Sequence, residues 1–278
     1  MTTPEKIRVS GPSVLAAMVP SLLGFTPADG SLVVITLVDR RVGMTARVDD
    51  PGVDKVEGLA AELAPALRRG EPELTGLVVI GWQAATGVAS DLMWALRRLG
   101  LPTIEALVVQ DGRVADDCCQ GPWQPLGTDV LRPVTVVQGQ VNADSREDLE
   151  DRITWCGSVK PPHGGDQLIV DGWRATVHTV DDRDHALAMF GHASVEKLAQ
   201  DVEGLSLTLR FTPTWGPKRD DLLALLAVAA WLRGNGALAS IALDQASTGH
   251  SLSMLLRQAL AVTLPPAELR KLLASMPA

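Results

Sequence analysis

The sequence predicts an α/β protein with an N-terminal mixed sheet and a C-terminal helical subdomain. Two runs rich in Val, Ile and Thr, at 31–38 and 42–49, flank a short charged connector and predict an antiparallel β-hairpin. Strand and helix patterns then alternate up to Val109, which predicts parallel strands joined by crossover helices. From Lys218 onward the pattern is helical. We therefore expect an α/β domain at 1–140, an irregular middle region with a helix and candidate strands at 141–215, and a helical subdomain at 216–278.

The hairpin is the element around which this fold is expected to form. With a three-residue loop, the facing residues are Val38 and Val42, Val33 and Arg47, and Ser31 and Asp49. Successive side chains point to opposite faces, so one face is nearly all apolar and must be buried. That face carries Leu32, Val34, Thr36, Val38, Val42, Met44, Ala46 and Val48. The other face begins apolar and ends polar, at Ser31, Arg47 and Asp49.

The other elements of the N-terminal half follow from periodicity and turn residues. The segment 10–23 predicts a helix with an apolar stripe, which a glycine ends. A second helix follows Gly52, and Pro65 near its end implies a kink or an early stop. Buried strands are expected at 74–82 and 104–109, with a helix from Thr86 to Leu99 between them.

Patterns in the middle of the chain are weaker. Residues 111–127 hold two cysteines and two prolines and predict an irregular segment. Further elements expected there are a strand at 131–137, a short helix at 144–153, a loop at 155–165, a long helix at 181–203 and a strand at 205–211. The helices expected at the end of the chain cover 218–233, 236–247, 250–262 and 265–275.

Composition argues against several classes of protein. The 278 residues carry a net charge of −8 and are 46% apolar. An acidic surface repels the phosphates of nucleic acids, so we expect no nucleic-acid partner. The longest apolar run, Leu222 to Leu232, is about half the length that spans a bilayer. The first residues lack the apolar core of a signal peptide, and the three cysteines form no disulfide framework. We therefore expect no membrane association and a cytoplasmic location.

Six residues form a candidate ligand site at one edge of the expected sheet. Ligands of open α/β sheets bind beyond the carboxyl ends of the parallel strands. Those ends, together with the start of the antiparallel first strand, supply Asp29, Ser31, Arg47, Asp49, Trp82 and Asp111. An arginine beside carboxylates and an indole could hold a small polar or anionic ligand by forked hydrogen bonds and stacking. The alternative is structural, with Arg47 and Asp49 pairing with local groups to close the hairpin.

Other motifs that could carry chemistry lack the context that the chemistry needs. W-C-G-S-V-K at 155–160 is similar to a thioredoxin active site, but Val159 stands in place of the second cysteine. His178, His185 and His192 are spaced by seven residues, whereas zinc ligands on helices favour spacings of three or four. G-N-G-A-L-A at 234–239 matches a dinucleotide fingerprint but follows a helix pattern instead of a strand. We expect no metal and no cofactor.

Several segments together resemble a known bacterial family. They are S-G-P at 10–12, L-L-G-F-T-P-A-D at 22–29, T-A-R-V-D-D-P at 45–51, D-C-C-Q-G-P at 117–122 and A-W-L-R-G-N-G-A-L-A-S-I-A-L-D-Q-A at 230–246. The combination resembles the domain of unknown function 4192 family, with Gly30 inserted between an Asp and a Ser that the family keeps adjacent. The resemblance implies an architecture and no established activity.

Two functions remain open at this point. The segment 230–236 with Ala239 and Ala246 resembles one tetratricopeptide-like helical hairpin, which either presents a surface to a protein partner or packs on its neighbours. The first function is a cytoplasmic, non-enzymatic binding or regulatory protein that acts through its helical C-terminal region. The second is an enzyme that acts on a small polar or anionic substrate at the sheet edge. In that enzyme Asp49 or Asp29 would be the acid or base and Arg47 the anion clamp.

Overall fold

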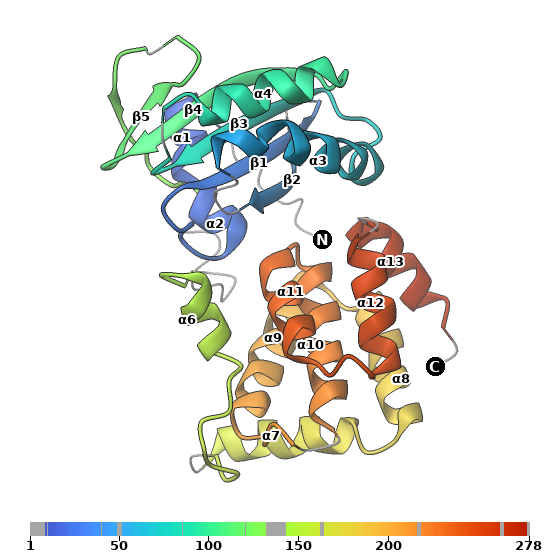
Figure 1. Cartoon of the computed structure of the whole chain (residues 1–278). Helices are drawn as coiled ribbons and strands as arrows, with labels where there is room; N and C mark the ends of the chain where they lie inside the picture. Colours follow the sequence, from blue (N-terminus) through green and yellow to red (C-terminus); the bar gives the residue numbers. More distant parts are fainter. Residues whose placement is uncertain are drawn as a thin grey trace. The chain divides into compact units, whose positions relative to one another are not determined.

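The computed structural model describes residues 9, 11–39, 41–48, 52–84, 86–119, 121–131, 143–161, 164–215, 218–261 and 264–276. The chain folds into two compact units, Met1–Val137 and Gln138–Ala278 (Figure 1). The first contains a mixed sheet with helices, and the second is helical, so the predicted α/β class with a helical C-terminal region is confirmed. No helix within the described ranges is long and apolar enough to cross a membrane.

The sheet of the first unit has the strand order β2-β1-β3-β4-β5-β6 over the described residues. β1 (Ser31–Val38) is antiparallel to both β2 (Arg41–Val48) and β3 (Gly76–Trp82), whereas β3 is parallel to β4 (Thr103–Gln110). α4 (Val88–Arg98) connects β3 and β4, as a parallel pair requires. β5 (Arg113–Asp116) and β6 (Gln124–Pro125) extend the sheet within the segment expected to be irregular.

Both faces of β1 are buried. α3 (Val56–Gly70), which follows the short helix η1 (Val53–Lys55), packs with α4 on the face that carries Leu32 and Val34. α1 (Pro12–Ala17) and α2 (Val19–Leu23), expected as one helix, contact β4 and β2 respectively. Val33 and Ile35, on the other face of β1, are also fully buried. The apolar face expected to be buried is therefore buried in β1, and the opposite face is buried as well, because β1 is a central strand between layers of helix.

The register of the hairpin agrees with the expected one only at its open end. Val33 faces Arg47 as predicted, but Val38 faces Arg41 instead of Val42. Between Ile35 and Leu37 the register shifts, because β2 holds one more residue there than β1. The extra residue makes a β-bulge at Gly43 and Met44, and such bulges are common on edge strands.

Glu71, just after α3, covers this bulge. Its Oε1 accepts a hydrogen bond from the Met44 backbone N–H at 2.8 Å. A Cβ atom at Gly43 would collide with that same oxygen and with Thr36 Oγ1. Gly43 therefore allows the carboxylate to reach the outer edge of the sheet, and Pro65 does not stop α3 before it.

The second unit is a bundle around one central helix. Its elements are α6 (Arg146–Asp151), α7 (Gly165–Thr176), α8 (Val180–His192), α9 (Val195–Arg210), α10 (Arg219–Leu232), α11 (Gly236–Gln245), α12 (Ser251–Ala261) and α13 (Pro266–Ala274). α10 contacts α8, α9, α11, α12 and α13, and residues 222–232 are all buried. α10 and α11 form the expected hairpin, in which Asn235 caps α11 by accepting the Leu238 N–H. α10 is enclosed by these helices, so the α10 side of the hairpin packs within the unit.

The middle of the chain is more helical than expected. Residues 205–210, expected as part of a strand, end α9, because this helix buries Leu198, Val202, Leu205 and Leu209 at helical spacing. The long helix expected at 181–203 is divided into α8 and α9 at Ala193 and Ser194, where Ser194 Oγ accepts the Lys197 N–H as an N-cap. The strand expected at 131–137 lies outside the described residues except for Leu131.

A buried arginine joins the ends of several of these helices. The Arg219 guanidinium donates to the carbonyls of Leu209, Thr212 and Ile153 and to Gln245 Oε1, at 2.8–3.0 Å. Burial lowers the pKa of Arg219, which is 4% exposed. The planar, multiply donating head group suits this position, because it satisfies carbonyls that a helix end leaves without partners.

Candidate functional site

The structure brings three of the six predicted site residues together at the sheet edge. Ser31 at the start of β1 pairs with Trp82 at the end of β3, and both side chains are buried. Arg47 lies on the neighbouring strand, where its Nε donates to Ser31 Oγ at 3.1 Å. Its guanidinium also lies 5.3 Å from the centre of the Phe25 ring, a cation–π contact. These contacts hold the arginine against the start of β1.

The three predicted carboxylates are placed differently. Asp29 lies in the turn before β1 and Asp111 in the turn between β4 and β5, and both are exposed. Asp111 has a φ of 49°, and its backbone N–H donates to Gln83 Oε1 at 3.3 Å. Asp49 lies outside the described residues. Ser31, Arg47 and Trp82 are therefore the part of this candidate site with a defined geometry, and ligand binding there is still a proposal.

A carboxylate of the chain itself occupies the helix start at this edge. Asp117 is buried, and its two oxygens accept the backbone N–H groups of Gly87 and Ser90 at 2.7 and 2.8 Å. Donors at a helix N-terminus after a strand are where α/β proteins often hold a phosphate or another anion. In this protein Asp117 takes that role for α4, so those two donors are already paired.

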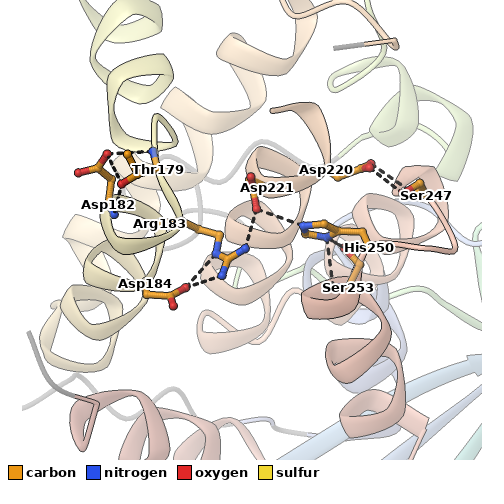
Figure 2. A network of polar contacts seen from close by, with 9 residues as sticks. All are labelled: Thr179, Asp182, Arg183, Asp184, Asp220, Asp221, Ser247, His250 and Ser253. Atoms are coloured by element: carbon orange, nitrogen blue, oxygen red, sulfur yellow. Dashed lines mark hydrogen bonds and ion pairs between the residues drawn. The ribbon is translucent and has the colours of Figure 1, made fainter. Parts of the chain in front are cut away.

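A second polar cluster joins α8, α10 and α12 in the helical unit (Figure 2). Asp221 Oδ1 accepts hydrogen bonds from Arg183 Nη1 at 2.9 Å and from His250 Nε2 at 3.1 Å. Arg183 also binds Asp184, and although burial lowers the pKa of Arg183, its bonds to the two aspartates outweigh this and raise it. His250 Nδ1 lies 2.7 Å from Ser253 Oγ.

The order Asp221, His250, Ser253 is that of a hydrolase triad, but its burial favours a structural role. Ser253 is completely buried, so its hydroxyl cannot reach a substrate. His250 Nδ1 also accepts the Ser253 backbone N–H at 3.4 Å, which makes the imidazole a cap for α12. The cluster therefore fastens α12 to α10, and through Arg183 to α8.

An apolar groove lies between α7, α8 and α9. It has a volume of about 1010 Å³. Its apolar side chains are those of Leu168, Ile169, Trp173, Ala186, Met189, Phe190, Ala193 and Leu207. Ala186 and Phe190 are buried at its base, whereas Leu168 is 76% exposed and Met189 53% exposed. We call this feature the α7–α9 groove.

Polar side chains of the α7–α9 groove bring mostly negative charge. Asp166, Asp201 and Glu203 contribute three carboxylates, and Lys197 contributes one ammonium group. His185 and His192, considered above as metal ligands, also line the groove. No group of three or more metal-binding side chains is present among the described residues. The groove therefore complements a ligand that is mostly apolar and carries a positive charge.

A family comparison accounts for most of the chain. The model of the family described as domain of unknown function DUF4192 matches residues 12–206 and 173–267. This chain belongs to the DUF4192 family. The resemblance seen in the sequence is thereby confirmed. No significant match was found among curated proteins or among solved structures.

Motifs that resemble the DUF4192 family fall at structural contacts. In S-G-P, Pro12 begins α1, and the adjoining Ser13 carbonyl accepts the Gly127 N–H at 3.1 Å. A Cβ at Gly127 would lie 2.9 Å from Val14 Cα, so only glycine permits this approach. The D-C-C segment supplies Asp117, the cap of α4. These two motifs therefore contribute structural contacts in this DUF4192 chain.

Cys118 of this DUF4192 chain lies in an environment that disfavours its charged form. Partial burial, and then the charges of Asp116 and Asp117, raise the pKa of Cys118, which disfavours the reactive thiolate. The Cys118 and Cys119 backbone N–H groups both donate to Asp116 Oδ1. Cys156 lies in an exposed loop, where its N–H donates to the Arg210 carbonyl at 2.9 Å.

Sequence reasoning missed the α7–α9 groove because α7 was not predicted as a helix. A usable signal was present, since Leu168, Ile169, Trp173 and Thr176 recur at helical spacing after the Gly164–Gly165 pair. α7 buries only Val170 fully, so its apolar side chains remain on the surface.

Proposed function

We propose that this protein is a non-enzymatic binding protein of the cytoplasm that holds an amphipathic helix of a partner protein in the α7–α9 groove. The observation that supports this is a groove of about 1010 Å³ whose apolar walls stay exposed to solvent. Soluble proteins rarely leave such a surface uncovered unless it binds something. The site lies in the helical unit, beside the α10–α11 hairpin first considered for this role.

The open shape of the groove favours a helix over a small molecule. Small-molecule pockets bury roughly 70–90% of their ligand. Here Leu168 on one wall and Met189 on another are more than half exposed, so a small ligand would remain largely exposed to solvent. An amphipathic helix keeps its polar face in water and inserts anchors at i, i+3, i+4 and i+7. Met189 adds a flexible, polarisable side chain, of the kind that adapts to helical partners.

Binding is favoured over catalysis because the groups that could react are engaged elsewhere. Ser253 is buried, Asp117 caps α4, and Arg47 donates to Ser31. Each of these contacts has a structural explanation, whereas the exposed apolar walls of the α7–α9 groove have none within the described part of the chain.

The test is a binding assay with a designed helix. A fluorescein-labelled peptide of roughly 15 residues, near the shortest length that forms a helix, carries leucines at i, i+3, i+4 and i+7 and glutamines elsewhere. Fluorescence anisotropy should show saturable binding to the full chain. Met189→Glu should weaken this binding by about tenfold or more, because it places a charge among the apolar contacts.

Leu255→Glu is the matched control, since Leu255 is an apolar residue on α12 that lies outside the groove and is also more than half exposed. It should leave the affinity unchanged, and circular dichroism should show the same helix content in both variants. Equal effects of the two substitutions would contradict the proposal. A dimer of the chain that Met189→Glu dissociates, seen by sedimentation, would identify a second copy as the occupant and would also overturn it.

A further inference from the structure

Asp201 is a buried carboxylate in the α7–α9 groove with an incomplete set of partners. Its side chain is 6% exposed, and Lys197 Nζ donates to its Oδ1 at 2.7 Å. Its Oδ2 accepts no hydrogen bond from any described residue and keeps some contact with solvent, so a ligand in the groove can reach it. The Lys197 side chain is itself 61% exposed, so the described donor to Asp201 is a group that lies mostly in solvent.

Comparison with Asp117 shows how unusual this arrangement is within the same chain. Asp117 is buried to a similar degree, but both of its oxygens accept fixed backbone N–H groups. A buried charge is costly unless it is paired and fully hydrogen-bonded. An exposed lysine four residues away on the same helix contributes only a few tenths of a kcal/mol. Asp201 is therefore available for a stronger donor.

The surroundings of Asp201 favour a donor that is positively charged. Asp166 on α7 and Glu203 on α9 add two carboxylates to the same groove, where Lys197 is the one lysine or arginine among the lining residues. Leu168, Ile169 and Trp173 of α7 supply apolar contacts in the same groove. Apolar contacts and a buried acceptor thus lie within one site.

From these observations, and resting on the proposed function, we infer that the partner helix carries a lysine or arginine among its apolar anchors. This side chain pairs with Asp201 and replaces the Lys197 ammonium group. The apolar walls then supply affinity, and Asp201 selects basic helices over neutral and acidic ones. A charge-assisted bond in a partly desolvated groove is stronger than its exposed counterpart.

The test compares peptides that share the leucine anchors of the designed helix. One lysine is moved through the positions that flank the anchors, and a matched series carries glutamine or glutamate there. At one position the lysine peptide should bind the full chain about tenfold more tightly than its glutamine counterpart. Asp201→Asn should abolish this preference, whereas Lys197→Gln, which removes the competing ammonium group, should increase it.

Asp181→Asn is the control for long-range charge, because Asp181 is an exposed aspartate on α8 outside the groove. It should leave the preference intact. Equal binding of lysine and glutamine peptides, or a preference that survives Asp201→Asn, would overturn the inference while leaving the proposed function standing. Absence of Met189-sensitive binding for every peptide would overturn both.

Discussion

Glu105 on β4 is an acidic side chain whose surroundings disfavour its charge. Partial burial raises the pKa of Glu105 above its ordinary value of 4.5, and the negative charge of Asp116 on β5 raises it further. The folded chain therefore holds this proton more tightly than the unfolded chain does. It follows that the free energy of unfolding decreases as the pH rises through the window above 4.5.

Glu105→Gln should remove this pH dependence while keeping the shape of the side chain. The variant and the parent should have similar urea midpoints near pH 4, and the variant should become the more stable one as the pH approaches 7. Glu62→Gln, at an exposed position on α3, is the control. A difference between Glu105→Gln and the parent that stays constant from pH 4 to 7 would show that Glu105 has no such role.

Single residues also show which parts of the candidate site can be predicted from the positions of strand ends. Ser31, Arg47 and Trp82 were predicted to meet because strand direction alone brings their strand ends to one edge. Asp29 and Asp111 belong to turns, whose side-chain directions depend on local backbone angles such as the positive φ of Asp111. Asp117 could not be predicted as the cap of α4, because it reaches Gly87 across 30 residues of chain.

α7 is the element on which the candidate site depends, and Gly204 on α9 determines how closely it packs. A Cβ at Gly204 would lie 2.5 Å from Trp173 Nε1 and 3.2 Å from Ile169 Cγ2, so both α7 side chains would have to move. A Cβ at Gly172, on α7 itself, would have no heavy atom within 4 Å outside its own helix backbone and chain neighbours. The two glycines thus form a matched pair in one groove.

Gly204→Ala should destabilise the protein by about 1–3 kcal/mol, because overpacking outweighs the gain in helix propensity. Gly172→Ala should stabilise it by up to about 1 kcal/mol through that same propensity. Urea unfolding followed by circular dichroism measures both. Similar free energies of unfolding for the two variants would mean that Trp173 does not pack against Gly204.

Element types were predictable where one periodicity dominates. β1, β3, β4 and the last four helices were expected within a few residues of their ends, because turn residues bound apolar runs whose lengths fit one element type. α9 was partly assigned as a strand, since a short apolar run such as Leu205–Phe211 fits both periods. The break between α8 and α9 lies at Ala193 and Ser194, and in the last turn of α8 Gly191 approaches the backbone of α13, a tertiary contact.

At the scale of the whole molecule, the two compact units have separate cores. One is centred on β1, β3 and β4 and the other on α10. Strand and helix alternation made the first unit predictable. The extent of the second could not be predicted, because the irregular pattern of 141–215 conceals helices that are stabilised by packing against α10.

Leu226→Ala tests whether these cores unfold independently. Leu226 is completely buried in α10, so the substitution should cost about 2–5 kcal/mol. Hydrogen exchange should then lose protection across α8 to α13, with little change in β1, β3 and β4. The reciprocal variant, Val79→Ala in β3, should show the opposite pattern. Loss of protection throughout the chain in either variant would mean that the units unfold together.

The Glu71 carboxylate lies at the outer edge of β2 and affects how this edge could pair with another molecule. A strand from another molecule could not pair with the Met44 N–H at this edge, because that group already donates to Glu71. The negative charge of Glu71 would also oppose its approach. Intermolecular sheet growth, the usual first step toward fibres, is thereby discouraged on this side. Concentrated solutions of the protein should therefore form no β-rich aggregates that begin at β2.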